Sequence, residues 1–376
     1  MKILVAVSNY YPTEKIFSTY YERNRNIYYK EQGAEVSVLN FSAKENYIVD
    51  NIQTYSLHSI EKKLEQDSFD ILVCHAANIR NHYILLKKHE KKFKSIVFIF
   101  HGQEVVKISQ VYPKPYEWNK HMVVLKTIFR NCYDILKINL WRKFHKKLAR
   151  KSHYVFVSDS LYREFMFFLK IKPSLLNNRY SIIHNGVGHL FEKRYYDYKV
   201  EKQFDFITIR SNIDSSVYCL DIIVFLARKY PNNRFLVIGV GKFFDYEKKP
   251  ENLIHINKHL NHNELMEWID ISKCALMPTR RDTQGVMSCE LATYGIPLIS
   301  SDISVCREIL SSFENVKLVS DYTKVDLICI LNNLFSKLPY DKQSRYFAEN
   351  TSGVEFELFN KLIRKNLSGE YENNIE

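Results

Sequence analysis

The stretch "TRRDTQGVMSCELATYGIPLISSDI", residues 279–303, decides how this chain is interpreted. It joins a charged polar loop to a short predicted helix, and Gly-Ile-Pro at 295–297 separates that helix from a predicted strand. Within the helix, Glu290 stands among the apolar residues Val286, Met287 and Leu291. A carboxylate in an apolar segment is costly to bury without a partner. Glu290 therefore needs either a structural partner or a ligand.

Short apolar runs alternate with amphipathic segments along the whole chain of 376 residues. Runs of this length, separated by helical periodicity, are typical of buried parallel strands. A first series lies at 2–7, 34–39, 70–75, 95–100 and 153–158, and a second at 204–210, 234–240, 252–256, 274–279, 296–301 and 316–320. Two such series predict an α/β fold with two Rossmann-like, doubly wound domains facing across a cleft.

A charged stretch without clear periodicity, "EKRYYDYKVEKQ" at 192–203, follows the first series. We therefore place an N-terminal domain at 1–190 and a C-terminal domain at 191–351. The end of the chain contains "GVEFELFNKLIRKN", which has the pattern of a helix. We expect residues 352–376 to pack back onto the first domain.

The formal net charge of +12 favours an anionic partner. Seven cysteines are scattered without a C-x-x-C pair, which is typical of a reducing compartment. The chain opens directly with a predicted strand and contains no apolar run long enough to span a membrane. We expect a cytoplasmic protein, with a peripheral position at the inner face of the plasma membrane as an alternative.

Residues 117–151 form a basic amphipathic segment, predicted as a helix pair. Its apolar residues recur at helical spacing, Lys and Arg fill much of the remaining surface, and Asp134 is the one acidic residue after Glu117. Such a segment can lie on an anionic bilayer. It can equally cover the first sheet and present a solvated basic face. The sequence leaves both interpretations open.

The sequence lacks several common catalytic motifs. "IGVGKF" supplies Gly239 and Gly241 but no third glycine, so the dinucleotide fingerprint is incomplete. Walker A, G-x-S-x-G, H-E-x-x-H and D-x-D sequences are missing. We therefore expect no metal and no cofactor.

The predicted helix at 285–294 begins with free amides at Gly285, Val286 and Met287, which is a favourable place for a phosphate. Side chains tilt toward a helix N-terminus, so Glu290 can reach a ligand held by those amides. Other polar residues arrive from the preceding strand end, where open α/β sheets bind ligands: Arg280, Arg281 and Asp282. Sugar hydroxyls would donate hydrogen bonds to the carboxylate of Glu290. The alternative is that Glu290 pairs with a Lys or Arg for structure alone, and that Asp282 caps the helix.

This stretch resembles the donor-binding signature of retaining glycosyltransferases of family 4, which have the two-domain GT-B architecture. Asp282 and Glu290 match its two spaced acidic residues, followed by Gly295 and Pro297. The resemblance extends over most of the chain through "IIHNGV" at 182–187, "HG" at 101–102, "FITIR" at 206–210 and "FLVIGVG" at 235–241.

The resemblance implies roles for the matching positions. Glu290 would hold ribose hydroxyls, Asp282 would contact the donor sugar, and Arg210 would offset charge on the leaving phosphate. His101 would line the sugar pocket. Further donor-binding candidates are Gly285, Val286, Met287, Gly239, Gly241, Arg280, Arg281, Ser215 and Ser216, and acceptor-side candidates are Asn9, Tyr10, Tyr11 and Glu104. The co-substrate would be a sugar nucleotide of the UDP or GDP type.

The sequence also departs from the family pattern. Asp282 replaces the usual Glu, and Thr283 stands where glycine is frequent. Ser215 and Ser216 occupy the place of a lysine that assists the diphosphate, which leaves Arg280 or Arg281 as substitutes. The loop "SNYYPTEKIF" lacks the paired glycines often found after the first strand.

These features predict a retaining, metal-independent glycosyltransferase that uses a glycan or lipid-linked glycan acceptor in surface-polysaccharide assembly. Two alternatives remain open: a sugar-nucleotide epimerase of the same architecture and a non-catalytic protein that binds a nucleotide sugar. Nucleic acid is not favoured as a partner, because the positive charge is spread along both domains rather than gathered on a known module.

Overall fold

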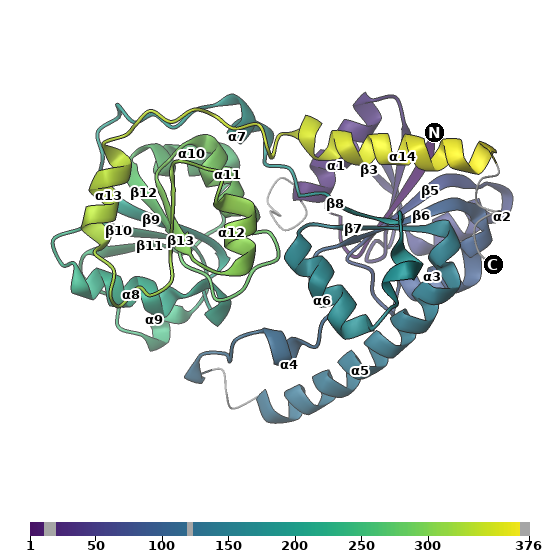
Figure 1. Cartoon of the computed structure of the whole chain (residues 1–376), viewed down its shortest axis with the longest axis horizontal. Coiled ribbons are helices and arrows are strands. Elements are labelled where there is room, and N and C mark those ends of the chain that lie inside the picture. The colour runs from purple at the N-terminus through teal and green to yellow at the C-terminus, as the bar shows by residue number, and fades with distance from the viewer. Residues whose placement is uncertain (11–19, 119–122, 369–376) are drawn as a thin grey trace. The chain divides into compact units, whose positions relative to one another are not determined.

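The computed structural model describes residues 1–10, 20–118 and 123–368. The chain forms two compact units (Figure 1). Unit 1 comprises 1–110, 129–186 and 348–376, and unit 2 comprises 111–128 and 187–347. The expected boundary at 190 lies near the observed one after Gly186. Residues 111–128, which we expected in the N-terminal domain, group instead with unit 2.

Unit 1 is built on a sheet that contains eight strands in the described residues, in the order β3-β4-β2-β1-β5-β6-β7-β8. All neighbours are parallel except β3 and β4. The predicted strands are confirmed to within a few residues, whereas the β3–β4 hairpin was not predicted. The strands are β1 Lys2–Val7, β2 Glu35–Asn40, β3 Tyr47–Val49, β4 Ile52–Tyr55, β5 Phe69–His75, β6 Phe93–Phe100, β7 Ser152–Phe156 and β8 Tyr180–Ile182.

Helices cover this sheet, and polar side chains fix where several of them begin. Ser56 and Ser158 accept backbone N–H bonds from Ser59 and Leu161 at the starts of α2 and α6. Residues 123–148 of the basic segment form one continuous helix, α5, rather than the expected pair. The helices are α1 Tyr20–Glu31, α2 Leu57–Gln66, α3 His82–His89, α4 Ile108–Val111, α5 Val123–Leu148, α6 Asp159–Leu169 and α14 Ser352–Ser368, with 3-10 turns at Glu90–Lys92, Ala149–Lys151, Pro173–Leu176 and Ala348–Asn350.

The C-terminal helix packs back onto unit 1, as the sequence predicts. α14 contacts α1 and β6, and Phe359 is fully buried in the core of this unit. A buried ion pair fixes the contact: Arg25 Nε lies 2.9 Å from Glu355 Oε2, and Arg25 Nη1 donates to Asn185 Oδ1 at 2.8 Å. The Tyr29 hydroxyl also donates to Glu355. The last helix is therefore held by charge as well as by apolar packing.

Unit 2 is built on an all-parallel sheet that shows six strands among the described residues, in the order β11-β10-β9-β12-β13-β14. All the strands predicted for the second series are confirmed. The strands are β9 Phe204–Asn212, β10 Phe235–Val240, β11 Leu253–Ile256, β12 Ser272–Met277, β13 Leu298–Ser301 and β14 Val316–Val319. The helices are α7 His189–Lys193, α8 Leu220–Lys229, α9 Phe243–Tyr246, α10 His262–Asp270, α11 Val286–Tyr294, α12 Ser304–Leu310 and α13 Leu327–Phe335, with a 3-10 turn at Ser216–Tyr218.

Alternate residues along each strand of unit 2 enter two separate cores. Ile207 and Leu236 pack on the face covered by α10, α11 and α12. Phe206 and Phe235 pack on the other face, covered by α8 and α13. Coverage on both faces explains why these strands read as continuous apolar runs. The strand order reverses between β9 and β12, so the carboxyl ends of these two strands form the topological switch point of the sheet.

We predict that Glu355→Ala lowers the free energy of unfolding by about 3–5 kcal/mol, because it leaves the buried Arg25 guanidinium without its partner. Urea denaturation measures this loss. Arg23→Ala is a matched control, since Arg23 pairs with Asp50 nearer the surface. We expect the control to cost about 1 kcal/mol. Equal losses in both variants would contradict a special role for the buried pair.

Candidate functional site

Residues 279–303 lie at the switch point of the unit 2 sheet. Loop 279–285 follows β12, and α11 begins directly after it. The Thr279 amide donates to Ser301 Oγ at 2.8 Å, and the Thr279 hydroxyl donates to the Arg281 carbonyl at 2.8 Å. These bonds fasten the start of the loop to β13, so the residues that follow have a defined position.

Asp282 organises the rest of the loop. Its Oδ1 accepts backbone N–H bonds from Thr283 at 2.8 Å, Gln284 at 3.2 Å and Gly285 at 2.7 Å. A Cβ at Gly285 would lie 2.8 Å from Asp282 Oδ2, so the loop needs glycine there. Asp282 therefore caps the loop and not the helix, because α11 begins at Val286 and has no side-chain cap.

The amides at the start of α11 differ in their availability. The Gly285 amide is occupied by Asp282. The amides of Val286 and Met287 form no hydrogen bond within the part of the chain that the structure describes, and Gly285 provides no side-chain cap. Of the three predicted amide donors, these two can receive an anion.

Glu290 is 4% exposed. Its Oε1 accepts the Gly188 amide at 3.0 Å and lies 3.8 Å from His262 Nε2. Burial lowers the pKa of His262 to about 4, so this imidazole is neutral near pH 7. No Lys or Arg in the described ranges forms an ion pair with Glu290, and the alternative of a structural pair with such a residue is wrong.

Burial raises the pKa of Glu290 from 4.5 to about 7, and the Gly188 amide offsets part of the rise. A Cβ at Gly188 would lie 2.5 Å from His262 Cε1 and 3.2 Å from Glu290 Oε1. Glycine at position 188 thus allows the backbone to approach the carboxylate closely. The site holds a carboxylate that titrates close to neutral pH and is not neutralised by a neighbouring cation.

Arg210 lies on β9 at the same switch point and is 7% exposed. Its Nη2 donates to the Pro278 carbonyl at 2.6 Å, and its guanidinium lies 5.0 Å from the centre of the Tyr218 ring. Its Nε is buried and has no hydrogen-bond partner among the described residues. Burial lowers the pKa of Arg210, and the charge of Asp282 opposes this effect. A buried cation with an unused donor suits an anionic ligand.

Gly239, Gly241 and Ser216 have structural roles. A Cβ at Gly239 would lie 2.1 Å from the Arg210 carbonyl oxygen, and one at Gly241 would lie 2.6 Å from Ile213 Cγ1. The Ser216 hydroxyl donates to the Lys114 carbonyl at 2.7 Å. Ser215 immediately precedes the 3-10 turn at 216–218, and no role in binding follows from its position.

The two arginines of the loop differ. The Arg280 guanidinium makes two bonds to Asp221, at 2.5 and 3.0 Å, and donates to the Ser216 carbonyl at 2.8 Å. The Arg281 guanidinium lies 4.6 Å from the centre of the Tyr112 ring. Burial raises the pKa of Asp282, and the charges of Arg210 and Arg281 oppose this rise. Of the two arginines expected to substitute for the missing lysine, Arg281 is the one whose charge acts on Asp282.

In unit 1, His101 lies just after β6, and its backbone amide donates to Glu104 Oε1 at 2.6 Å. Glu104 Oε2 accepts the Gly102 amide, so Glu104 closes this turn. His101 Nε2 lies 3.1 Å from Nδ1 of His75, the last residue of β5. Burial lowers the pKa of both rings, to about 3 for His101. The pair is therefore neutral.

The other acceptor-side candidates follow β1. Tyr10 is fully buried in the core of unit 1, and its hydroxyl accepts a bond from Asn26 Nδ2 at 3.2 Å. Asn9 is exposed and accepts a bond from the Ser42 hydroxyl at 2.8 Å. Tyr11 lies outside the described residues. Asn9 thus remains open to a ligand, whereas an acceptor would not reach the ring of Tyr10.

Three contributors were missed from the sequence. His75 was detectable, because the apolar runs of two adjacent strands each lead into a histidine, in "DILVCH" and "IVFIFH". Gly188 and His262 had no local signal, because they meet Glu290 only through the tertiary fold.

Residues 218–351 match the family model described as glycosyl transferases group 1. No curated protein sequence matches the chain. Similar solved structures include sucrose-phosphate synthase from Thermosynechococcus elongatus (10% identity, TM-score 0.72, covering 96% of this chain and 99% of that chain). Another is WaaG, a glycosyltransferase involved in lipopolysaccharide biosynthesis (11% identity, TM-score 0.57, covering 97% of this chain and 95% of that chain). A third is the catalytic domain of starch synthase IV from Arabidopsis thaliana bound to ADP and acarbose (11% identity, TM-score 0.58, covering 98% of this chain and 99% of that chain).

The fold is therefore the two-domain GT-B fold of glycosyltransferases. The family match covers most of unit 2, including loop 279–285 and α11, and it supports a glycosyltransferase. Within the described ranges, no helix is both long and apolar enough to cross a membrane, and no group of three or more His, Cys, Asp or Glu side chains is placed to hold a metal ion.

The raised pKa of Glu290 gives a prediction for stability against pH. Between pH 4.5 and 7, the folded protein keeps a proton on Glu290 that the unfolded chain releases, so this residue destabilises the fold as pH rises. Glu290→Gln removes this titration. We predict that its free energy of unfolding rises by about 3 kcal/mol relative to that of wild type as the pH goes from 4.5 to 7.

Chemical denaturation of both proteins at several pH values measures this gain. Glu267→Gln, which changes an exposed carboxyl on α10, is the control and should track wild type. A difference between Glu290→Gln and wild type that does not vary with pH would show that Glu290 titrates normally.

Proposed function

We propose that this protein is a retaining glycosyltransferase of family 4 that transfers a sugar from a nucleotide-diphosphate sugar, without a bound metal. The acceptor is a glycan or a lipid-linked glycan in surface-polysaccharide assembly, and the reaction takes place in the cytoplasm at the inner face of the plasma membrane. The observation that carries the proposal is the buried carboxylate of Glu290 behind unused amides at the start of α11.

The chemistry of a nucleoside diphosphate fits this arrangement. A diphosphate would accept bonds from the amides of Val286 and Met287, where the dipole of α11 also favours negative charge. Arg210 would add a buried positive charge with an unused donor. The ribose hydroxyls would donate to the carboxylate of Glu290, which the described part of the protein leaves without a cation.

Transfer requires charge stabilisation at the leaving phosphate. As the bond between the sugar and the diphosphate breaks, negative charge grows on the diphosphate oxygen, and Arg210 and the amides of α11 would stabilise that charge. Asp282 would orient the donor sugar through its second carboxylate oxygen, since Oδ1 is used by the loop. The resemblance to family 4 also implies a role for His101 in binding the sugar. The resemblance to family 4 supports retention at the anomeric carbon.

We predict that one of UDP, GDP, ADP and CDP raises the melting temperature more than its monophosphate does. A ligand at about 100 times its Kd adds about 2.7 kcal/mol to the free energy of unfolding. Differential scanning fluorimetry with each nucleotide measures the shift. We expect Glu290→Ala to lose the shift, because the ribose hydroxyls lose their acceptor.

Glu267→Ala is the control for that variant, and it should keep the wild-type response. An unchanged response in Glu290→Ala would remove the ribose assignment. Incubation of the sugar nucleotide without acceptor tests the alternatives: an epimerised sugar nucleotide would identify an epimerase. Nucleotide binding without turnover over a broad acceptor panel would identify a binding protein.

The outward face of α5 supports the membrane part of the proposal. Asp134, Ile138 and Trp141 are buried on one side of the helix. The opposite side presents exposed apolar residues in its first part and basic residues further on: Ile128, Phe129, Ile135 and Leu136, then Lys143, Lys146 and Lys147. Apolar side chains beside lysines suit the interface of an anionic bilayer.

We predict that the protein sediments with vesicles of phosphatidylcholine and phosphatidylglycerol but not with phosphatidylcholine alone. The double variant Phe129→Ser, Leu136→Ser should lose most of this binding, because it removes the apolar contacts. Ile84→Ser, an exposed apolar residue of α3, is the control. Equal sedimentation with both vesicle types would overturn the electrostatic part of the proposal, and binding that the double variant keeps would exclude the α5 face.

A further inference from the structure

Residues 111–118, here called the strap, begin at the last residue of α4 and precede α5 in the chain, yet they group with unit 2. The chain therefore passes between the units after residues 110 and 128, in addition to the passages after 186 and 347. A segment that leaves one domain and returns costs conformational entropy to order. The strap makes specific contacts that compensate for this cost.

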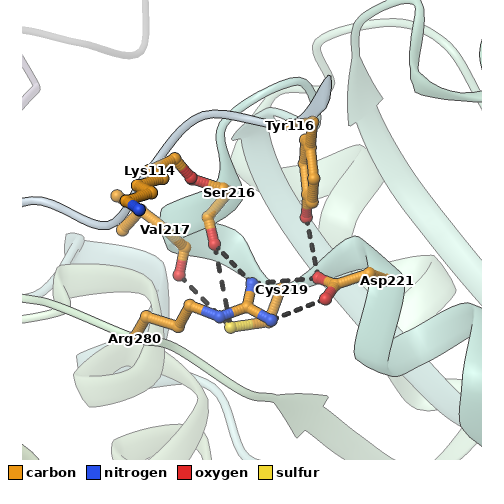
Figure 2. A network of polar contacts seen from close by, with 7 residues as sticks. All are labelled: Lys114, Tyr116, Ser216, Val217, Cys219, Asp221 and Arg280. Carbon is orange, nitrogen blue, oxygen red and sulfur yellow. Dashed lines mark hydrogen bonds and ion pairs between the residues drawn. The ribbon is translucent and has the colours of Figure 1, made fainter. Parts of the chain in front are cut away.

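The central contact of the strap is the hydroxyl of Tyr116, which donates to Asp221 Oδ1 at 2.9 Å (Figure 2). The same carboxylate receives both terminal nitrogens of Arg280. Burial raises the pKa of Asp221, but the bonds from Arg280 and Tyr116 outweigh this and hold the pKa below its ordinary value. Asp221 is therefore ionised and joins the strap to Arg280.

Three further contacts fix the strap on both sides of Tyr116. The Lys114 carbonyl accepts the Ser216 hydroxyl at 2.7 Å. The Trp118 ring stacks on Tyr246 with 5.3 Å between ring centres and an interplanar angle of 6°. The Tyr112 ring lies 4.6 Å from the Arg281 guanidinium carbon. These contacts reach the 3-10 turn at 216–218, α9 and loop 279–285.

Arg280 connects the strap to the candidate site. Its backbone amide donates to the Val217 carbonyl at 3.0 Å, and its side chain donates to the Ser216 carbonyl (Figure 2). Arg280 and Arg281 directly precede Asp282, whose carboxylate holds the amides up to Gly285. Any displacement of Arg280 would therefore move the loop that leads into α11.

We propose that the strap positions loop 279–285, with Tyr116 and Asp221 as positioning residues that act through Arg280. The consequence for nucleotide binding rests on the proposed function, whereas the ordering of the loop does not. The proposed donor site therefore depends on a segment that lies, in chain order, between two stretches of unit 1.

The rings of Tyr116 and Trp118 also pack edge-on against Phe243, with 5.1 and 5.3 Å between ring centres, at the edge of the core beneath α8 and α13. A cavity of about 290 Å³ within unit 2 is lined by residues 114–118 of the strap and by Asp221, Phe243 and Glu247. Tyr116→Phe keeps the ring and these apolar contacts and removes the hydroxyl alone. This makes the contribution of the Tyr116 hydroxyl measurable.

Hydrogen exchange of the amides in 279–287, measured in the full chain without ligand, tests the proposal. We expect Tyr116→Phe to speed this exchange about three- to ten-fold, the effect of losing one hydrogen bond to a partly exposed carboxylate. Asp221→Asn should speed it further, because it also removes the charge opposite Arg280. Tyr340→Phe is the matched control, since it removes a hydroxyl bond of 2.7 Å to the Leu334 carbonyl elsewhere in unit 2.

The affinity of the best nucleoside diphosphate is then compared in the same proteins by calorimetry. A several-fold loss in Tyr116→Phe, with Tyr340→Phe unchanged, supports positioning of the donor loop. Unchanged exchange in both Tyr116→Phe and Asp221→Asn would overturn the proposal. Faster exchange with unchanged affinity would overturn its link to the donor site. If wild type binds no nucleotide, the proposed function fails while the exchange result still decides whether the strap orders the loop.

Discussion

The buried carboxylate of Glu290 imposes the main physical constraint on unit 2. It is held by one backbone amide, from Gly188, beside a neutral His262, and no cation in the described residues compensates its charge. Ionisation at this place costs free energy of folding. Position 188 is restricted to glycine by the same contact, because a Cβ would collide with His262. A bound ligand that donates hydrogen bonds to the carboxylate offsets this cost.

The rest of the site follows from the position of Glu290 at the switch point of the sheet. The reversal of strand order between β9 and β12 brings Arg210 and loop 279–285 to one edge. Asp282 then shapes the loop by accepting three amides, which leaves the next two amides at the start of α11 for a ligand. The charges are arranged so that an anion and a set of hydroxyls can be bound side by side, which is the chemistry of a sugar nucleotide.

The sequence predicted those parts of the molecule that depend on local patterns. The strands were found because both of their faces are buried and each reads as an apolar run, as in "FLVIGV" of β10. Helix α11 was placed correctly between Gly285 and Gly295, where the left-handed φ of 96° at Gly295 ends it. The β3–β4 hairpin was missed because strands of three and four residues carry little periodicity.

Features that depend on tertiary contacts could not be predicted. Gly188 approaches Glu290 from a residue 102 positions earlier in the chain, and Tyr116 reaches Asp221 across 105 positions. No local pattern marks residues 111–118 as part of the second unit. The assignment of Arg280 to the diphosphate had the same weakness, because the partner that occupies its guanidinium lies far away in sequence.

The most direct test of the central claim is a crystal structure of the protein with the nucleoside diphosphate that stabilises it most. We predict that the diphosphate contacts the amides of Val286 and Met287 and the guanidinium of Arg210, with both ribose hydroxyls on the carboxylate of Glu290. A nucleotide bound elsewhere, with Glu290 still in contact with only Gly188 and His262, would contradict the account.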